Sequence, residues 1–219
     1  FPECLPASAV VVLHEVFGVN ADMRATCDEL ASDGFVAICP DLFWRQQPGL
    51  DLNRWTDAEW KIGLDLNAAF DRDHGVQDVA ETIQFARALD GVTGRVGVMG
   101  FCLGGLLTFL TAAREEVDAA VAYHGGDTEK YLNEVASITA PMIMHLGGRD
   151  EYIPPDAQAA IKAAVTEKDN VTVYSYPENY HAFARHSGTH YDPVAAELAN
   201  GRTREFFSTH LNKPKNVAV

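Results

Sequence analysis

The residues best suited to covalent chemistry lie around Cys102, in the segment Gly100-Phe101-Cys102-Leu103-Gly104-Gly105. An apolar strand pattern precedes this G-x-C-x-G motif and a helical pattern follows it directly. A nucleophile on a sharp strand-to-helix turn needs small neighbours, because the turn is strained and crowded. The helix N-terminus would also favour a thiolate and bind an oxyanion. The alternative interpretation is a buried cysteine in a glycine-rich turn.

Two further residues come in the order that such a nucleophile requires, which is nucleophile, acid, histidine. Asp150 follows the apolar run at 142–146, and His181 follows the run at 171–176. All three side chains are therefore expected at the carboxyl edge of one parallel sheet, where α/β enzymes place their sites. Taken singly, Asp150 could be a turn or capping residue and His181 a surface histidine. The shared order and topology favour a Cys-His-Asp triad.

The elements that must position these residues alternate along the chain. A mostly parallel, doubly wound α/β sheet with helices on both faces is therefore expected, in one domain spanning 1–219. Residues 41–55 form the one long irregular stretch, and such loops often cover sites. Strands are predicted at 10–13, 35–39, 95–99, 119–123, 142–146 and 171–176, and helices at 22–32, 57–70, 76–89, 103–113, 154–165 and 194–211.

Composition excludes several classes of function. The 219 residues carry a net charge of −14, which repels phosphate backbones and argues against nucleic-acid binding. No apolar run reaches the roughly 18 residues needed to span a bilayer, so no membrane association is expected. The chain needs no disulfides at this size, and a cytoplasmic location is expected. The cysteines are Cys4, Cys27, Cys39 and Cys102, with no C-x-x-C pair, and we expect four free thiols.

From about residue 10 to 210 the chain resembles the dienelactone hydrolase (carboxymethylenebutenolidase) family of α/β-hydrolases. The matching segments are His14-Glu15-Val16-Phe17-Gly18-Val19-Asn20, Pro40-Asp41-Leu42-Phe43, the Cys102 motif, Gly148-Arg149-Asp150 and His181-Ala182-Phe183-Ala184-Arg185.

The resemblance implies a role for each member of the triad. Cys102 would be the nucleophile, His181 the base and Asp150 the residue that orients it. The backbone N–H groups of Leu103 and Val16 would form the oxyanion hole. It also implies hydrolysis of small lactones or esters through an acyl-enzyme, with no cofactor.

The resemblance further assigns residues around the triad. Glu15 would contact the resting cysteine and help to activate it. From the residues alone, Glu15 follows an apolar strand, and burying a carboxylate there is costly unless it is paired. The alternative for Glu15 is a solvated loop acid. Arg185 would bind a substrate carboxylate, a task that suits a bidentate donor, or it could be an exposed loop residue. Tyr123 and Phe17 are expected to contact the substrate, although Tyr123 could equally lie at the edge of the core.

One position departs from the family pattern. The family places a second arginine in the helical segment after the long loop, and counting back from Ala69-Phe70-Asp71 puts that position at or near Trp60. The nearest cations, Arg54 and Lys61, do not align. We therefore expect a pocket that accepts larger or aromatic esters and lactones, with Arg185 as the main anion contact.

Other interpretations compete with a hydrolase. The fold could serve a non-catalytic small-molecule binding or sensing protein. A peroxide-sensing thiol would need a resolving cysteine near Cys102, and none is close in sequence. His181, His186 and His190 form a small cluster, but a metal site would want more ligands and supporting groups, so we expect no metal. The expected partner is a small lactone or ester, and the expected assembly is a monomer or weak homo-oligomer.

Overall fold

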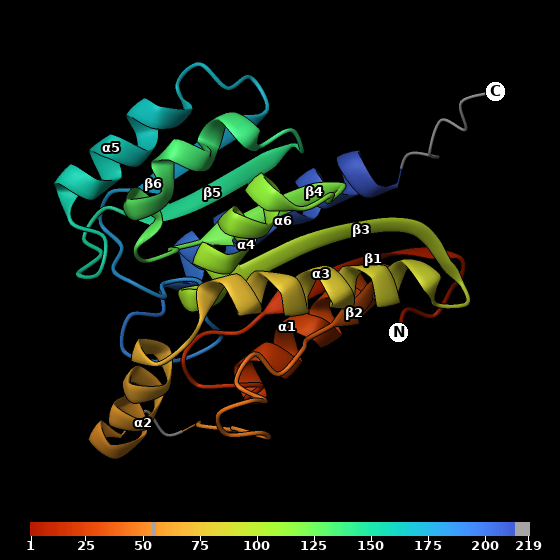
Figure 1. Ribbon diagram of the computed structural model, residues 1–219, viewed down its shortest axis with the longest axis horizontal. Coiled ribbons are helices and arrows are strands. Elements are labelled where there is room, and N and C mark those ends of the chain that lie inside the picture. The colour runs from red at the N-terminus through yellow and green to blue at the C-terminus, as the bar shows by residue number, and fades with distance from the viewer. Residues whose placement is uncertain (54–55, 213–219) are drawn as a thin grey trace.

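A six-stranded, fully parallel sheet forms the centre of the computed structural model, which describes residues 1–53 and 56–212 (Figure 1). The strand order is β2-β1-β3-β4-β5-β6, and each neighbouring pair is parallel. This confirms the predicted parallel α/β architecture. The strands are β1 (Ala7–Leu13), β2 (Val36–Ile38), β3 (Val92–Phe101), β4 (Ala119–Tyr123), β5 (Met142–Gly147) and β6 (Val171–Tyr176).

Helices cover both faces of the sheet and separate its core into two clusters. Side chains of α1 and α6 pack on one face, whereas those of α3, α4 and α5 pack on the other. Helix α2 projects from one end of the molecule (Figure 1). The α-helices are α1 (Ala21–Ser32), α2 (Asp57–Ala68), α3 (Arg72–Ala88), α4 (Leu103–Arg114), α5 (Pro155–Val165) and α6 (Pro193–Leu211). Among the described residues, no helix has both the length and the apolar character that crossing a bilayer requires.

Short polar residues set several helix starts. The side chain of Asn20 accepts the Met23 N–H at the start of α1, and Thr56 and Glu59 form a capping box on α2. Asp71 accepts the N–H groups of Asp73 and His74, so α3 begins at Arg72, four residues earlier than predicted. A 3-10 segment at Thr128–Ser137 was not predicted, because its sequence lacks a continuous helical period.

The first turn of α4 approaches two strands more closely than a side chain would permit. A Cβ on Gly104 would overlap the carbonyl group of Leu13 and lie 2.9 Å from the carbonyl oxygen of His14. A Cβ on Gly105 would overlap the Tyr123 carbonyl oxygen. These glycines therefore let the N-terminus of α4 rest directly on the carboxyl ends of β1 and β4.

We predict that Gly104→Ala destabilises the protein by at least about 2 kcal/mol, because backbone atoms must move to admit the Cβ. Urea unfolding measures this change. Gly201→Ala in α6 is the matched control, since the nearest atom to its added Cβ is a side-chain nitrogen of Arg204 at 3.8 Å. There the gain in helix propensity should stabilise the protein by up to about 1 kcal/mol. Equal effects of the two substitutions would contradict the packing argument.

Candidate active site

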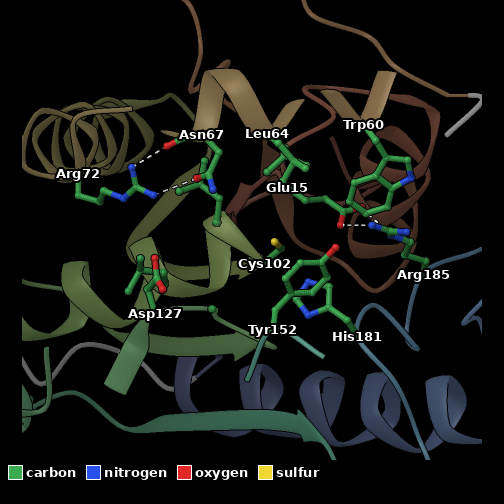
Figure 2. Close-up of a pocket in the computed structure, with 14 residues that line it drawn as sticks. Glu15, Trp60, Leu64, Asn67, Arg72, Cys102, Asp127, Tyr152, His181 and Arg185 are labelled. Carbon is green, nitrogen blue, oxygen red and sulfur yellow. Dashed lines mark hydrogen bonds and ion pairs between the residues drawn. The ribbon is translucent and has the colours of Figure 1, made fainter. Parts of the chain in front are cut away.

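Cys102 occupies the strained turn between β3 and α4 that the sequence predicts. Its backbone has φ 53° and ψ −114°, an unusual conformation for a residue with a side chain, and it is the N-cap of α4. Its N–H donates to the Tyr123 carbonyl oxygen at 3.1 Å, which ties the turn to β4. The thiol lines a pocket above the sheet, where Figure 2 shows its sulfur near the centre.

His181 and Asp150 form a buried pair beside this cysteine. The two carboxylate oxygens of Asp150 lie 3.0 and 2.9 Å from Nδ1 of His181, and neither residue is more than 4% exposed. Asp150 Oδ1 also accepts the backbone N–H groups of Tyr152 and Ile153, which fixes the carboxylate. Because Asp150 binds Nδ1, the other ring nitrogen, Nε2, can exchange a proton with a group in the pocket.

Backbone bonds between two loops hold this pair in place. After β5 and β6, Gly148 N–H donates to the Tyr176 carbonyl, and Arg149 N–H donates to the Asn179 carbonyl. A Cβ on Gly147 would lie 2.6 Å from the Asn179 carbonyl oxygen, so this contact needs glycine. The loops that carry Asp150 and His181 are therefore joined to each other as well as to the sheet.

The charge state of His181 follows from its neighbours. Burial disfavours the imidazolium, but the interactions with Cys102 and with the Asp150 carboxylate outweigh it and raise the pKa of His181 to about 10. Nε2 is buried and has no hydrogen-bond partner among residues 1–53 and 56–212. His181 and Cys102 both line the pocket, so a protonated Nε2 has an unused donor there.

Two backbone N–H groups are available near the sulfur. Leu103 opens α4, where the first N–H groups of a helix lack intrahelical acceptors, and it lines the pocket with Val16. Neither N–H donates to an acceptor in the described part of the chain. A Cβ on Gly63 would lie 2.6 Å from the Val16 carbonyl oxygen, so α2 packs directly on this loop.

Glu15 and Arg185 bind each other in the pocket wall. Nε and Nη2 of Arg185 donate to the two carboxylate oxygens of Glu15 at 2.7 and 2.5 Å, and Glu15 is 1% exposed. Burial opposes the charge of Arg185, but Glu15 outweighs it and raises the pKa of the guanidinium. Glu15 is therefore a buried, paired carboxylate and not a solvated loop acid, and its partner Arg185 was not predicted. The expected contacts of Glu15 with Cys102 and of Arg185 with a substrate carboxylate stay predictions.

Of the expected substrate-binding residues, Trp60 lies in the pocket lining (Figure 2). Phe17 is fully buried behind it, with its ring 4.7 Å from the Trp60 ring in an edge-on contact. The expectation that Phe17 lines the pocket is wrong, because Trp60 and Arg185 cover it. Lys61 pairs with Asp65 at 2.6 Å and is not in the lining, and Arg54 lies outside the described residues.

Tyr123 corrects a second expectation, because its side chain lies on the opposite face of the sheet. It packs in the cluster formed with α1 and α6, and its hydroxyl contacts Asn200 and Thr203 of α6 at 2.9 and 2.6 Å. Burial raises the pKa of Tyr123 above its usual value. Tyr123 is a core residue and not part of the pocket lining.

Sequence reasoning missed several lining residues. Asn67 and Arg72 come from the junction of α2 and α3, and Tyr152 follows Asp150. The Tyr152 ring packs edge-on against His181 at 4.8 Å, and the His124 ring lies 4.5 Å from the same imidazole. No motif marks these positions, because only the tertiary fold brings them to the pocket.

The histidines near the site have separate partners. His186 lies 2.8 Å from Asp22 Oδ1 and 3.0 Å from Glu29 Oε1, both on α1, and His190 Nδ1 lies 3.1 Å from the His181 carbonyl oxygen. Among the described residues, no group of three or more His, Cys, Asp and Glu side chains is arranged to hold a metal ion.

Comparison with known proteins places these features in context. The model of the dienelactone hydrolase family matches residues 2–211. A carboxymethylenebutenolidase of Pseudomonas putida is 39% identical over 97% of this chain and 90% of its own. A relative from Azospirillum brasilense, named provisionally as the same enzyme, is 43% identical over 94% of this chain and 89% of its own.

Solved structures agree with the sequence comparisons. The crystal structure of a provisionally assigned dienelactone hydrolase from Klebsiella pneumoniae subsp. pneumoniae superposes with a TM-score of 0.82 at 27% identity. That alignment covers 94% of this chain and 90% of the other. The chain therefore has an α/β-hydrolase fold.

We predict that the protein loses stability as the pH rises, because His186 gives up its proton. The Asp22 hydrogen bond is the main cause that raises the pKa of His186 to about 9, so the folded state holds a proton that the unfolded state releases near pH 6.5. Its contribution is full below about pH 6.5 and is lost as the pH rises through about 9.

Between pH 7 and 10, wild type should lose on the order of 2 kcal/mol more unfolding free energy than His186→Gln. Urea unfolding across this pH range measures the difference. Every other titratable group is present in both proteins, so the comparison with the variant isolates the contribution of His186. Parallel curves for the two proteins would show that His186 does not carry this linkage.

Proposed function

The chain belongs to the dienelactone hydrolase family and is a lactone or ester hydrolase, and from this premise we propose that Cys102, His181 and Asp150 carry the reaction. The observation that most supports the proposal is the buried Asp150–His181 pair, whose free Nε2 shares a pocket with the cysteine at the strained turn. An acyl-enzyme on Cys102 is the proposed intermediate.

Acylation begins with the thiolate of Cys102, whose proton is held by His181. The sulfur attacks the carbonyl carbon, and the carbonyl π electrons move to oxygen. The N–H groups of Leu103 and Val16, two residues that line the pocket, would donate to that oxyanion. When the tetrahedral intermediate collapses, the bond to the leaving oxygen breaks and His181 donates its proton to that oxygen. A thioester remains on Cys102.

Deacylation reverses these roles. Neutral His181 removes a proton from a water molecule as the water attacks the thioester carbonyl. Collapse of the second tetrahedral intermediate releases the carboxylic acid and returns the electron pair to sulfur. Asp150 stays ionised throughout, keeps Nδ1 protonated and stabilises the imidazolium, as a residue that orients the base should.

The predicted roles of Glu15 and Arg185 require a rearrangement. For Arg185 to bind a substrate carboxylate, its two bonds to Glu15 must break, and this would leave a buried carboxylate to find a new partner. Contact of the released Glu15 with Cys102, as the family resemblance implies, would supply that partner while Cys102 holds its proton, because a thiol can donate to a carboxylate and a thiolate repels it. Until such an exchange occurs, the two charges compensate each other.

The remaining lining is largely apolar. Trp60, Leu64, Leu103 and Leu106 present flat or branched surfaces to the substrate. We therefore propose that the pocket accepts esters and lactones with bulky or aromatic bodies, with no nucleic-acid or membrane partner involved.

We predict that Cys102→Ala lowers kcat for an uncharged aryl ester and for a small lactone by about four orders of magnitude or more. His181→Ala should have a similar effect, because without a base the thiol stays protonated. Asp150→Asn should cost less, since Asp150 orients and does not react. The double variant of Cys102 and His181 should lose no more than either single variant, as expected of residues that act as a unit.

Cys39→Ala is the matched control, because it removes a second partly buried free thiol that does not line the pocket. Its kcat should stay within about two-fold of wild type. Circular dichroism and thermal unfolding establish that each variant is folded. A folded Cys102→Ala variant with the kcat of wild type would contradict the cysteine mechanism.

A further inference from the structure

The pocket holds two arginines at opposite ends, and they differ in how their charge is compensated. Figure 2 shows Arg185 on one side of Cys102 and Arg72 on the other. Arg185 is bound by both oxygens of Glu15, so that end of the pocket carries little net charge. Arg72 has no carboxylate within 4.0 Å in the described portion of the chain, so its charge is not neutralised by an ion pair.

Arg72 uses part of its donor capacity to shape the junction between α2 and α3. Nη1 donates to the carbonyl oxygens of Asn67 and Phe70 at 2.7 and 2.6 Å, and Nη2 donates to Oδ1 of Asn67 at 3.1 Å. A guanidinium has five N–H groups, so these three bonds leave two N–H groups for a ligand.

The same contact orients the amide of Asn67. Because Oδ1 accepts from Arg72, the amide NH₂ lies on the other side of the group, and Figure 2 shows the nitrogen turned away from Arg72. Asn67 lines the pocket and is only partly exposed. Arg72 and Asn67 thus offer adjacent donors and one positive charge, which suits a carboxylate.

One acid lies at this end of the pocket. Asp127 is in the lining, but Lys130 binds its carboxylate at 2.7 Å and compensates its charge. Asp127 therefore does not neutralise Arg72, which keeps its positive charge at this end of the pocket.

The catalytic geometry decides which part of a substrate reaches Arg72. His181 gives its proton to the leaving group, so the leaving group lies on the His181 side of Cys102. The acyl portion then extends to the other side, where Figure 2 places Asn67 and Arg72. Leu103 and Leu106 line the pocket with them and supply apolar surface for the acyl chain.

We propose that Arg72 and Asn67 form a subsite for a carboxylate on the acyl portion of the substrate, so that the preferred substrates are esters or lactones of dicarboxylic acids. This inference rests on the proposed function of Cys102 and deepens it. The substrate carboxylate leaves the Glu15–Arg185 pair intact and binds a cation that pairs with no carboxylate of residues 1–53 or 56–212.

The test compares 4-nitrophenyl hydrogen adipate with its methyl ester, which lacks the distal charge and carries one additional methyl group. Wild type should prefer the charged ester in kcat/KM, and Arg72→Gln should reduce that preference by about ten-fold or more. Arg72→Lys should keep most of the preference, and Asn67→Leu should lose part of it. Arg45→Gln removes a cation that pairs with Asp78 outside the pocket lining, and should leave the preference unchanged.

Two further measurements distinguish the proposal from a folding defect in the variant and from a substrate that binds in the reverse orientation. In wild type, added salt should lower kcat/KM for the charged adipate more than for its methyl ester. A second pair, 4-carboxyphenyl butyrate and phenyl butyrate, places the charge on the leaving group, and its ratio should not respond to Arg72→Gln.

The proposal is overturned if wild type shows no preference for the charged adipate, or if folded Arg72→Gln retains it. It is also overturned if Arg185→Gln abolishes the preference while Arg72→Gln does not, or if Arg72→Gln acts on the leaving-group pair instead. Failure of the cysteine mechanism has a different signature. In that case Cys102→Ala would hydrolyse both adipate esters at the wild-type rate, whatever the ratio of their kcat/KM values.

Discussion

The close packing of the first turn of α4 against the ends of β1 and β4 is the constraint on which the site depends. Only glycine at positions 104 and 105 lets the helix reach those strands, and Cys102 takes an unusual backbone conformation to join β3 to that helix. This placement puts Cys102 and Leu103, the first residue of α4, in the lining of the same pocket. A larger distance between α4 and the strand ends would move Cys102 and Leu103 away from the rest of the pocket. The strain at Cys102 is held by the hydrogen bond to Tyr123 and by the packing of α4, a helix with ten buried residues.

Among the described residues at the pocket, the charged groups compensate each other in pairs with one exception. Asp150 balances His181, and Glu15 balances Arg185, all four being nearly fully buried. Ion pairs of this kind cost desolvation free energy and contribute little net stability, so their value lies in orienting groups. Arg72 stands apart, because its partners are carbonyl and amide oxygens. Our proposal places the substrate carboxylate at Arg72 for this reason.

The sequence was sufficient for the framework because the signals there are local. All six strands and six α-helices were predicted, since apolar runs and helical periods alternate along the chain, and the order Cys102, Asp150, His181 fixed a common sheet edge. The face on which Tyr123 lies could not be predicted. A central parallel strand is buried on both sides, so its apolar run carries no alternation. The Glu15–Arg185 pair joins residues that are 170 positions apart through tertiary packing, whereas the Arg72–Asn67 contact spans the short junction between α2 and α3. Neither contact leaves a sequence motif.

The measurement that addresses the central claim most directly is intact-protein mass spectrometry of enzyme quenched in acid during turnover of a slow aryl ester. The account predicts a mass increase equal to one acyl group, located on the peptide that contains Cys102 and removed by hydroxylamine. The adduct should accumulate further in Asp150→Asn, because deacylation also needs an oriented base. An acyl group found reproducibly on another residue, with Cys102 unmodified throughout turnover, would contradict the account.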